Sequence, residues 1–424
     1  MRLRRFEWEG AGETATAIRG WTSESGQDVY GSVAAIDQQV HEEGDSAVLA
    51  LTAQFDATDV PPTELRLAPD AATGALASLA PELREALELS AANVGLVAEA
   101  QIGSGPSVTE LAQGQKVSLR EVPVGAAGIY APGGRAAYPS SVLMCAIPAR
   151  VAGVKRLALA SPPGPDGKLN PLVLAAAELC EIDEIYAMGG AQAIFAFAYG
   201  TETVVSVDVI AGPGNAWVRE AKRRVSGVVA IDSLAGPSEL MLVAGDGTDP
   251  EWAALDLCAQ AEHGGDGALL VAAVEEEVLD AVALATERVA AERSGVGDAP
   301  LALIQVPDLS DAIDLANAFA PEHLELFEED AALLAERVTT AGCVFAGRYA
   351  ATAFGDYAAG SNHVLPTGGA GRFSGPLGPG AFSRKIATVE VPAGAAAKLA
   401  PHVDALARAE GFPVHGESAM IRSQ

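Results

Sequence analysis

Residues 185–199, IYAMGGAQAIFAFAY, contain the unit from which this fold is built. The segment begins with a short apolar run at 185–188, which is typical of a buried strand. Two glycines then allow a tight turn, and an apolar helical pattern follows over 191–199. A short apolar strand that leads directly into a helix predicts one unit of a parallel sheet with right-handed crossovers.

The same alternation extends from this unit in both directions along the chain. Its nearest neighbours are predicted as helices at 141–152, 172–180 and 215–225, and as strands at 157–160, 204–210 and 228–231. A second series has predicted strands at 240–244, 269–273, 301–306, 324–327 and 343–346, with helices at 250–263, 275–293, 309–320 and 331–339. The sequence therefore predicts an α/β protein with two parallel-sheet units.

The region before these units reads differently. It is mostly helical from 29 to 100, with a long amphipathic helix at 81–100 and a strand at 117–124. A turn-rich segment at 128–134 then marks a domain boundary. A chain of 424 residues is too long for a single compact core, so two or more domains are expected.

Composition excludes several classes of function. The chain is 49% hydrophobic and 20% charged, as in globular proteins, and it has no apolar segment long enough to span a bilayer. Its net charge of −29 argues against binding to nucleic acid or an anionic membrane; it is compatible with a cationic small substrate, or simply with acidic, solvated helix faces. The N-terminus lacks the apolar run of a signal peptide, and the four cysteines are scattered, so we expect a cytoplasmic protein.

Three glycine-rich turns follow predicted strands. Gly212-Pro213-Gly214-Asn215 also opens a helix, where backbone amides can hold a phosphate or a ribose. The strict dinucleotide fingerprint is absent, because Trp217 stands where a third glycine is required. Similar turns at 188–192 and 130–134 make a nucleotide crevice one interpretation, and three tight connections the other.

Four of the six histidines fall in segments with candidate ligands or acids. Gln260 and His263 end the predicted helix 250–263 and share a face of its last turn, so they are plausible zinc ligands. Adjacent Glu322 and His323 suit two successive proton transfers, or they are a surface acid and a capping histidine.

The remaining candidates lie in loops and near the C-terminus. Asp356 and His363 share the glycine-rich segment 355–366, where the carboxylate is either a metal ligand or a turn cap. Glu410 and His415 matter only if the C-terminal segment docks elsewhere, because termini usually fray. Ser238, in Gly236-Pro237-Ser238-Glu239, could donate a hydrogen bond to a ligand, but it lacks the setting of a nucleophile elbow and could equally mark a hinge.

Taken together, these motifs resemble the histidinol dehydrogenase family over nearly the whole chain. The resemblance rests on the segments 130–134, 189–192, 212–215, 236–239, 260–264, 321–324 and 360–366. It implies two Rossmann-like, doubly wound parallel-sheet domains plus two small terminal domains. It also implies a four-electron oxidation of L-histidinol through histidinal to L-histidine, with two NAD reduced and one Zn²⁺ per subunit.

The resemblance also implies a role for each candidate residue. The implied zinc ligands are Gln260, His263, Asp356 and His415, and the ion would orient the substrate. His323 would take the alcohol proton and Glu322 would activate water against the aldehyde. Substrate contacts would come from the four ligands with Ser238, His323, His363 and Glu410, and NAD contacts from Tyr130, Gln192 and Asn215.

The family is a homodimer in which the tail of one subunit reaches the site of the other. The domains expected here are an N-terminal arm at 1–22, an α/β domain with the metal and catalytic residues at 23–129 and 240–375, an NAD-binding α/β domain at 130–239, and an exchanged C-terminal piece at 376–424. The rich Gly and Pro content of 375–382 and the Pro413 of the tail depart from the family pattern.

Two other classes of function remain open. A zinc hydrolase with Glu322 as its base would need no nucleotide crevice, so dependence on nicotinamide separates it from a dehydrogenase. A binding or assembly protein that kept the fold without turnover would form no NADH from histidinol.

Overall fold

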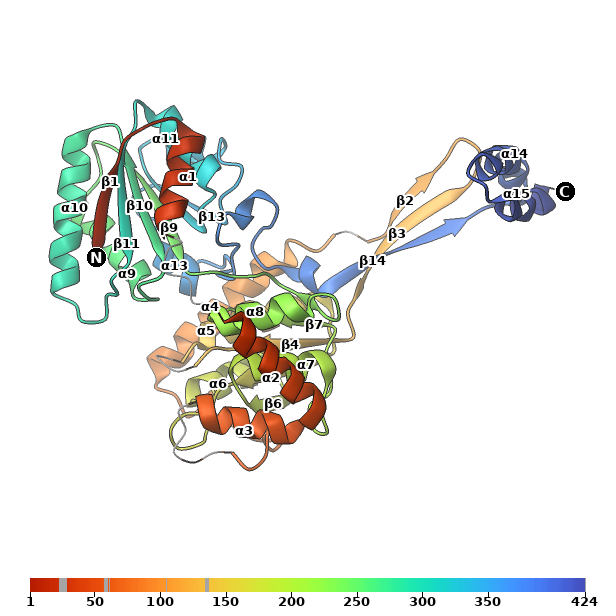
Figure 1. Cartoon of the computed structure of the whole chain (residues 1–424), viewed down its shortest axis with the longest axis horizontal. Helices are drawn as coiled ribbons and strands as arrows, with labels where there is room; N and C mark the ends of the chain where they lie inside the picture. Colours follow the sequence, from red (N-terminus) through yellow and green to blue (C-terminus); the bar gives the residue numbers. More distant parts are fainter. Residues whose placement is uncertain (23–28, 57–59, 61, 104, 134–136, 424) are drawn as a thin grey trace.

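The computed structural model describes residues 1–424 except 23–28, 57–59, 61, 104, 134–136 and 424. It consists of two α/β bodies that lie side by side and an arm that projects away from them (Figure 1). Each body is built around a parallel sheet, which confirms the predicted fold class. No helix in the described residues is long and apolar enough to cross a membrane.

The larger sheet has six parallel strands. In their order across the sheet they are β1 (Arg2–Phe6), β11 (Pro300–Gln305), β10 (Ala268–Ala273), β9 (Glu239–Ala244), β12 (His323–Phe327) and β13 (Cys343–Ala346). One face packs against α9 (Pro250–Ala261) and α10 (Glu276–Ala291). The other packs against α1 (Ala11–Thr22), α11 (Leu309–Phe319) and α12 (Ala331–Ala335). Helices on both faces explain why its central strands read as continuous apolar runs.

The smaller sheet has five parallel strands. In order they are β6 (Glu184–Ala187), β5 (Arg156–Ser161), β4 (Ala126–Tyr130), β7 (Val209–Ala211) and β8 (Ala230–Ile231). One face packs against α4 (Pro81–Glu99), α5 (Pro139–Ala152) and α6 (Pro171–Leu179). The other packs against α2 (Tyr30–Glu43), α3 (Asp45–Phe55), α7 (Gly190–Tyr199) and α8 (Ala216–Val225).

Both sheets are doubly wound with the strand order of a Rossmann fold. Counting from β9 in the larger sheet and from β4 in the smaller, the order is third, second, first, fourth, fifth. Most predicted elements agree with the structure to within two residues. The predicted strand 204–210 is an exception: β7 begins only at Val209, because the preceding residues turn back, and Val207 N donates to Phe197 O of α7.

The structure divides the chain differently from the predicted boundaries. Helices α2, α3 and α4, within the segment 23–129, pack on the five-stranded sheet rather than on the sheet of the segment 240–375. Residues 1–22 form no separate arm, because β1 adds an edge strand beside β11 and α1 packs beside α11. Periodicity shows that these helices bury one face, but it contains no information about which sheet they cover.

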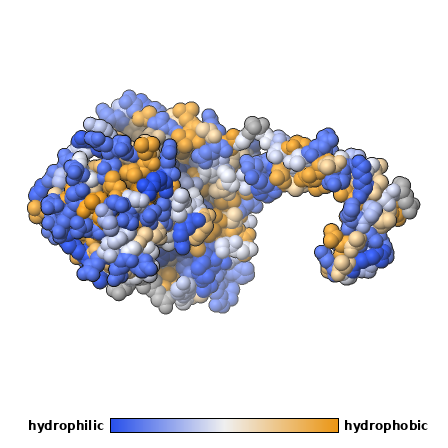
Figure 2. Space-filling view, turned by 90° about the horizontal axis from the view of Figure 1, so that it is seen from above, coloured by the Kyte–Doolittle hydropathy of each residue, from blue (hydrophilic) through white to orange (hydrophobic). Residues whose placement is uncertain are grey.

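An antiparallel sheet forms the stalk of the arm. Its strands, in order, are β14 (Ser383–Glu390), β3 (Lys116–Pro123) and β2 (Ser107–Glu110). The tip consists of α14 (Ala393–Ala409), α15 (Pro413–Met420) and the short η4 (Ile421–Ser423). Figure 2 shows the arm as a narrow hook outside the globular body, and its exposed apolar residues include Leu119, Val389, Leu406, Phe412, Val414 and Ile421.

Candidate active site

The predicted proton-transfer pair lies at the amino edge of the six-stranded sheet. Glu322 and His323 stand at the start of β12, beside Glu239, the first residue of β9. The backbone N–H of Glu239 donates to Glu322 Oε2 at 2.8 Å, and His323 Nδ1 lies 3.0 Å from the carbonyl oxygen of Glu239. Nδ1 must donate in that contact, so the lone pair of a neutral ring is on Nε2.

His323 Nε2 is buried without a hydrogen-bond partner among the described residues. The nearest carboxylate oxygen, Asp356 Oδ1, is 3.8 Å away, which is too long for a hydrogen bond. Burial lowers the pKa of His323 to about 4, and burial raises the pKa of Glu322 well above its usual range. The His323 imidazole is therefore neutral at pH 7 and able to accept a proton. The Glu322 carboxylate, in its ionised form, is a stronger base than an exposed carboxylate.

Three candidate metal ligands lie on or beside α9 and α13 (Thr352–Tyr357), and one of them, Asp356, is the carboxylate nearest to His323 Nε2. Gln260 lies in the last turn of α9, His263 follows that helix, and Asp356 lies on α13, which contacts α9. Burial lowers the pKa of His263 and raises the pKa of Asp356 to about 6. The amide nitrogen of Gln260 is buried without a partner among the described residues, so its side chain is available for another contact.

The fourth predicted ligand is not close to these three within one chain. His415 lies on α15 at the tip of the arm, exposed to solvent, with its ring centroid 5.6 Å from that of Phe412 (Figure 1). Glu410, at the end of α14, is also exposed there. Accordingly, the described part of the chain contains no group of three His, Cys, Asp or Glu side chains that could hold a metal ion.

His363 joins the two bodies. Its Nδ1 lies 2.9 Å from the carbonyl oxygen of Asp356, and its Nε2 lies 3.4 Å from Ser141 Oγ on α5. The adjacent Asn362 side chain donates to the carbonyl oxygen of Met144 on the same helix at 2.6 Å. Because α5 begins at the carboxyl edge of the five-stranded sheet, this loop brings that edge next to the amino edge of the other sheet.

The three predicted cofactor-binding residues lie at this carboxyl edge and stabilise its turns. Tyr130 ends β4, is buried, and accepts a hydrogen bond from Gly190 N on its hydroxyl at 3.0 Å. Gln192 is also buried, with its amide nitrogen 3.5 Å from Asp56 Oδ2. Asn215 caps α8, where its Oδ1 accepts from Trp217 N at 3.0 Å. The Gly134 of the first turn lies outside the described residues.

A buried ion pair fixes the turn that begins at Gly212. Lys222 Nζ donates to Asp232 Oδ1 and to the carbonyl oxygen of Gly212, both at 2.5 Å, and Asp232 Oδ2 accepts from Gly212 N at 2.8 Å. Gly212 has a φ of +129°, and a Cβ there would lie 2.0 Å from the carbonyl oxygen of Tyr130. Only glycine therefore fits between the ends of β4 and β7.

Several residues that support the site were not identified from the sequence. Glu239 holds both Glu322 and His323 through its backbone, while its buried carboxylate pairs with Arg19 of α1. Asp56 and the Lys222–Asp232 pair support the glycine turns. Glu239 follows Ser238 within a quoted motif, and Ser238 lies at the same edge of the sheet. The other residues carried no sequence signal, because their partners are distant in the chain.

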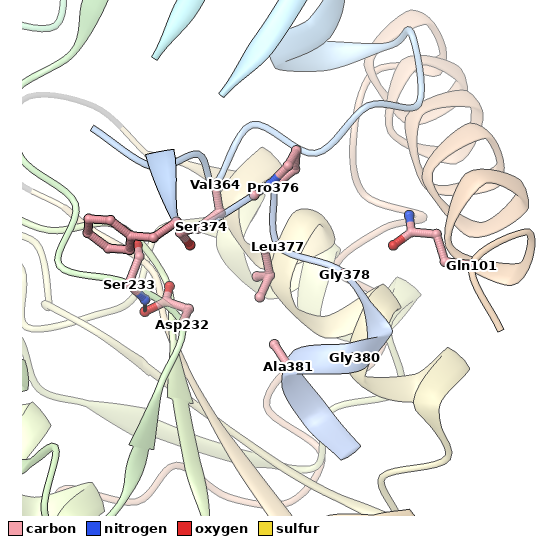
Figure 3. Close-up of a pocket in the computed structure, with 12 residues that line it drawn as sticks. Gln101, Asp232, Ser233, Val364, Ser374, Pro376, Leu377, Gly378, Gly380 and Ala381 are labelled. Carbon is pink, nitrogen blue, oxygen red and sulfur yellow. Dashed lines mark hydrogen bonds between the residues drawn. The ribbon is translucent and has the colours of Figure 1, made fainter. Parts of the chain in front are cut away.

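A cavity of about 410 Å³ opens between the end of β8 and the glycine-rich loop that leads to the arm (Figure 3). Val364, next to His363, lines one side, and Asp232 and Ser233 line another. Ser233 Oγ is buried and lacks a partner among the described residues. The rest of the lining is Gln101, Phe373, Ser374, Gly375, Pro376, Leu377, Gly378, Gly380 and Ala381, with η2 (Ala370–Arg372) and η3 (Pro379–Phe382) on either side of this loop.

Comparison with known proteins gives a consistent result. The family model described as histidinol dehydrogenase matches residues 21–423. The chain is 44% identical over 400 residues to a histidinol dehydrogenase of Nitrosomonas europaea, covering 93% of this chain and 92% of the relative. It is 46% identical over 406 residues to that of Rhodospirillum rubrum, covering 94% and 93%. A crystal structure of histidinol dehydrogenase from Elizabethkingia anophelis superimposes with a TM-score of 0.91 at 31% identity, covering 100% of this chain and 98% of that one.

Proposed function

The chain belongs to the histidinol dehydrogenase family, and on this premise we propose that it oxidises L-histidinol through histidinal to L-histidine while reducing two NAD. The observation that carries the proposal is the unpartnered Nε2 of a neutral, buried His323 beside the buried carboxyl of Glu322. Glycine-rich turns suited to a dinucleotide lie on the facing edge of the second sheet.

Two proton acceptors suit a two-stage oxidation. In the first stage His323 Nε2 takes the alcohol proton as the hydride leaves for the nicotinamide, which produces the aldehyde. Glu322 then takes a proton from water as the water oxygen attacks the aldehyde carbon, and it returns that proton to the resulting alkoxide, giving the hydrate. The hydrate loses the second hydride to a second NAD while His323, which has released its first proton to solvent, takes one hydroxyl proton. The carboxylic acid that results ionises to the carboxylate. The backbone of Glu239 keeps both side chains in place throughout.

The residues present fit a zinc ion. Gln260, His263, Asp356 and the His415 of a second subunit would hold it, and the ion would supply positive charge that orients the substrate. A neutral imidazole is the form that binds zinc, and the burial of His263 favours that form. The set contains no thiolate, so the protein adds only one negative charge and the ion stays electrophilic.

We further propose that the protein is a homodimer whose arm completes the partner's site. The arm tip carries His415 and Glu410 away from the rest of their own chain, together with exposed apolar side chains that a second copy would cover. Exposed aromatic side chains also lie on and near α9 and α13: Trp252, Tyr349, Phe354 and Tyr357. With the arm in place, Ser238, His363 and Glu410 would be the additional substrate contacts.

The test is the stoichiometry of NADH formed per L-histidinol, with and without a chelator. We expect two NADH per substrate, abolished by chelation and restored by zinc. One NADH per substrate would contradict the second oxidation, and turnover without any nicotinamide would support the hydrolase alternative. No NADH from zinc-loaded protein would contradict the proposed function altogether.

A further inference from the structure

The proposed reaction does not use a pair of acids buried behind the site. Glu325 is fully buried in β12, two residues beyond His323, and its Oε1 accepts a hydrogen bond from Thr352 N at 2.8 Å. Its Oε2 is buried with no N–H or O–H donor among the described residues. The carboxyl of Asp256, on α9, is in hydrogen-bonding contact with the Glu325 carboxyl.

A hydrogen bond between two carboxyls requires that one of them carries a proton. Two buried carboxylates in contact would repel each other strongly, so the pair retains a proton well above the usual range of either acid. Burial accordingly raises the pKa of Asp256 to about 6 and raises the pKa of Glu325 well above its ordinary value. Because the two carboxyls share a proton, the contact between Asp256 and Glu325 is attractive.

The partners of this pair lie on the elements that carry the candidate active-site residues. Asp256 precedes Gln260 by one helical turn on α9. Thr352 precedes Asp356 by one helical turn on α13. Glu325 and His323 are two positions apart on β12, so their side chains point to the same side of the sheet. One carboxyl pair thus connects two helices and a strand directly behind the site.

We propose that Asp256 and Glu325 are positioning residues whose hydrogen-bonded contact holds α9 and α13 against β12 and so fixes Gln260 relative to Asp356. The inference rests on the proposed function, since the two held residues are its candidate zinc ligands. Residues that hold metal ligands in position without binding the metal themselves typically lower metal affinity 10–100-fold when they are replaced.

The test is zinc affinity, measured by titrating metal-free, full-length protein with zinc against a competing chelator. Glu325→Met removes both hydrogen bonds, and we expect zinc to bind about 10–100-fold more weakly. Glu325→Gln keeps an oxygen for Thr352 N and gains an N–H for the Asp256 carboxylate, so its affinity should stay within about threefold of wild type. The matched control is Glu178→Met, because Glu178 accepts N–H bonds from Gly74 and Leu76 far from the site; it should bind zinc as wild type does.

A second pair of variants covers the case in which Glu325→Met does not fold. Asp256 is only partly buried, so Asp256→Leu removes the carboxyl contact and leaves the bond to Thr352 intact, while Asp256→Asn can still donate to Glu325. We expect Asp256→Leu to weaken zinc binding and Asp256→Asn to preserve it. The proposal would be overturned if Asp256→Leu or Glu325→Met bound zinc with wild-type affinity. It would also be overturned if Asp256→Asn and Glu325→Gln lost as much zinc affinity as those variants. Wild-type protein that binds no zinc would instead overturn the proposed function, and this inference with it.

Discussion

Apart from the extra edge strand β1, the two sheets have the same strand order, yet their candidate functional residues lie at opposite edges. In the five-stranded sheet the predicted cofactor turns follow the carboxyl ends of β4, β6 and β7. In the six-stranded sheet Glu322, His323 and Ser238 stand at the amino ends of β9 and β12. The general rule that ligands bind at carboxyl ends holds for the first sheet only. Strand order alone therefore does not locate a site.

The two edges also differ in whether backbone turns or ionisable side chains dominate them. At the carboxyl edge of the five-stranded sheet, side chains hold the glycine turns by accepting hydrogen bonds from their backbone: Tyr130 accepts from Gly190 N and Asp232 accepts from Gly212 N. At the amino edge of the six-stranded sheet, buried ionisable side chains are presented directly and the backbone of Glu239 holds them. The first edge is therefore a set of internally bonded backbone turns, whereas the second presents buried ionisable side chains, the kind of group that clusters at functional sites.

The largest effect should come from variants that test whether the arm of a second subunit completes the site at the amino edge of the six-stranded sheet. His323→Ala and His415→Ala chains should each be inactive alone, because each lacks a residue that every site needs. Coexpressed, they form mixed dimers with one intact site, so about a quarter of wild-type activity should return if chains pair at random. No recovery in a steady-state NADH assay of the mixed dimers would show that His415 serves its own chain.

Glu322→Gln should separate the two oxidations at the amino edge. The amide cannot take a proton from water, so oxidation of histidinal should slow by about 10²–10⁴-fold. Oxidation of the alcohol should change far less, since His323 keeps its contact with the carbonyl oxygen of Glu239. Single-turnover kinetics with each substrate measure the two steps; equal losses would remove the assigned role from Glu322.

The smallest effect concerns the carboxyl edge and depends on pH. Burial raises the pKa of Asp56 from 3.8 to about 6, so the folded state binds a proton that the unfolded state has already released. Stability from this group is present below pH 3.8 and is lost as pH rises through 6, by about 2–3 kcal/mol. The Asp56→Asn variant has no titratable group at this position. Its free energy of unfolding, measured with urea, should therefore fall less steeply between pH 4 and 7 than that of wild type. If the free energy of unfolding fell equally with pH in the two proteins, Asp56 would not be the source of the pH dependence.

Local signals were enough to predict most elements of the fold. Apolar runs followed by glycine turns and helices predicted both parallel sheets, because this periodicity depends only on neighbours in the sequence. For the same reason the sequence allowed Glu322 and His323 to share one pocket, as one of two interpretations, and in the structure Glu322 Oε2 lies 3.5 Å from His323 Nδ1.

By itself, the sequence determined the two α/β units, the positions of their turns and the candidate residues at the ends of strands and helices, since all of these follow from short-range patterns. Only the tertiary structure decided that α2–α4 cover the five-stranded sheet and that His415 lies far from the other candidate ligands of its own chain. It also decided that Glu239, paired with Arg19, holds Glu322 and His323 through its backbone. These features depend on contacts between segments from tens to hundreds of residues apart, which side-chain packing selects and no local pattern records.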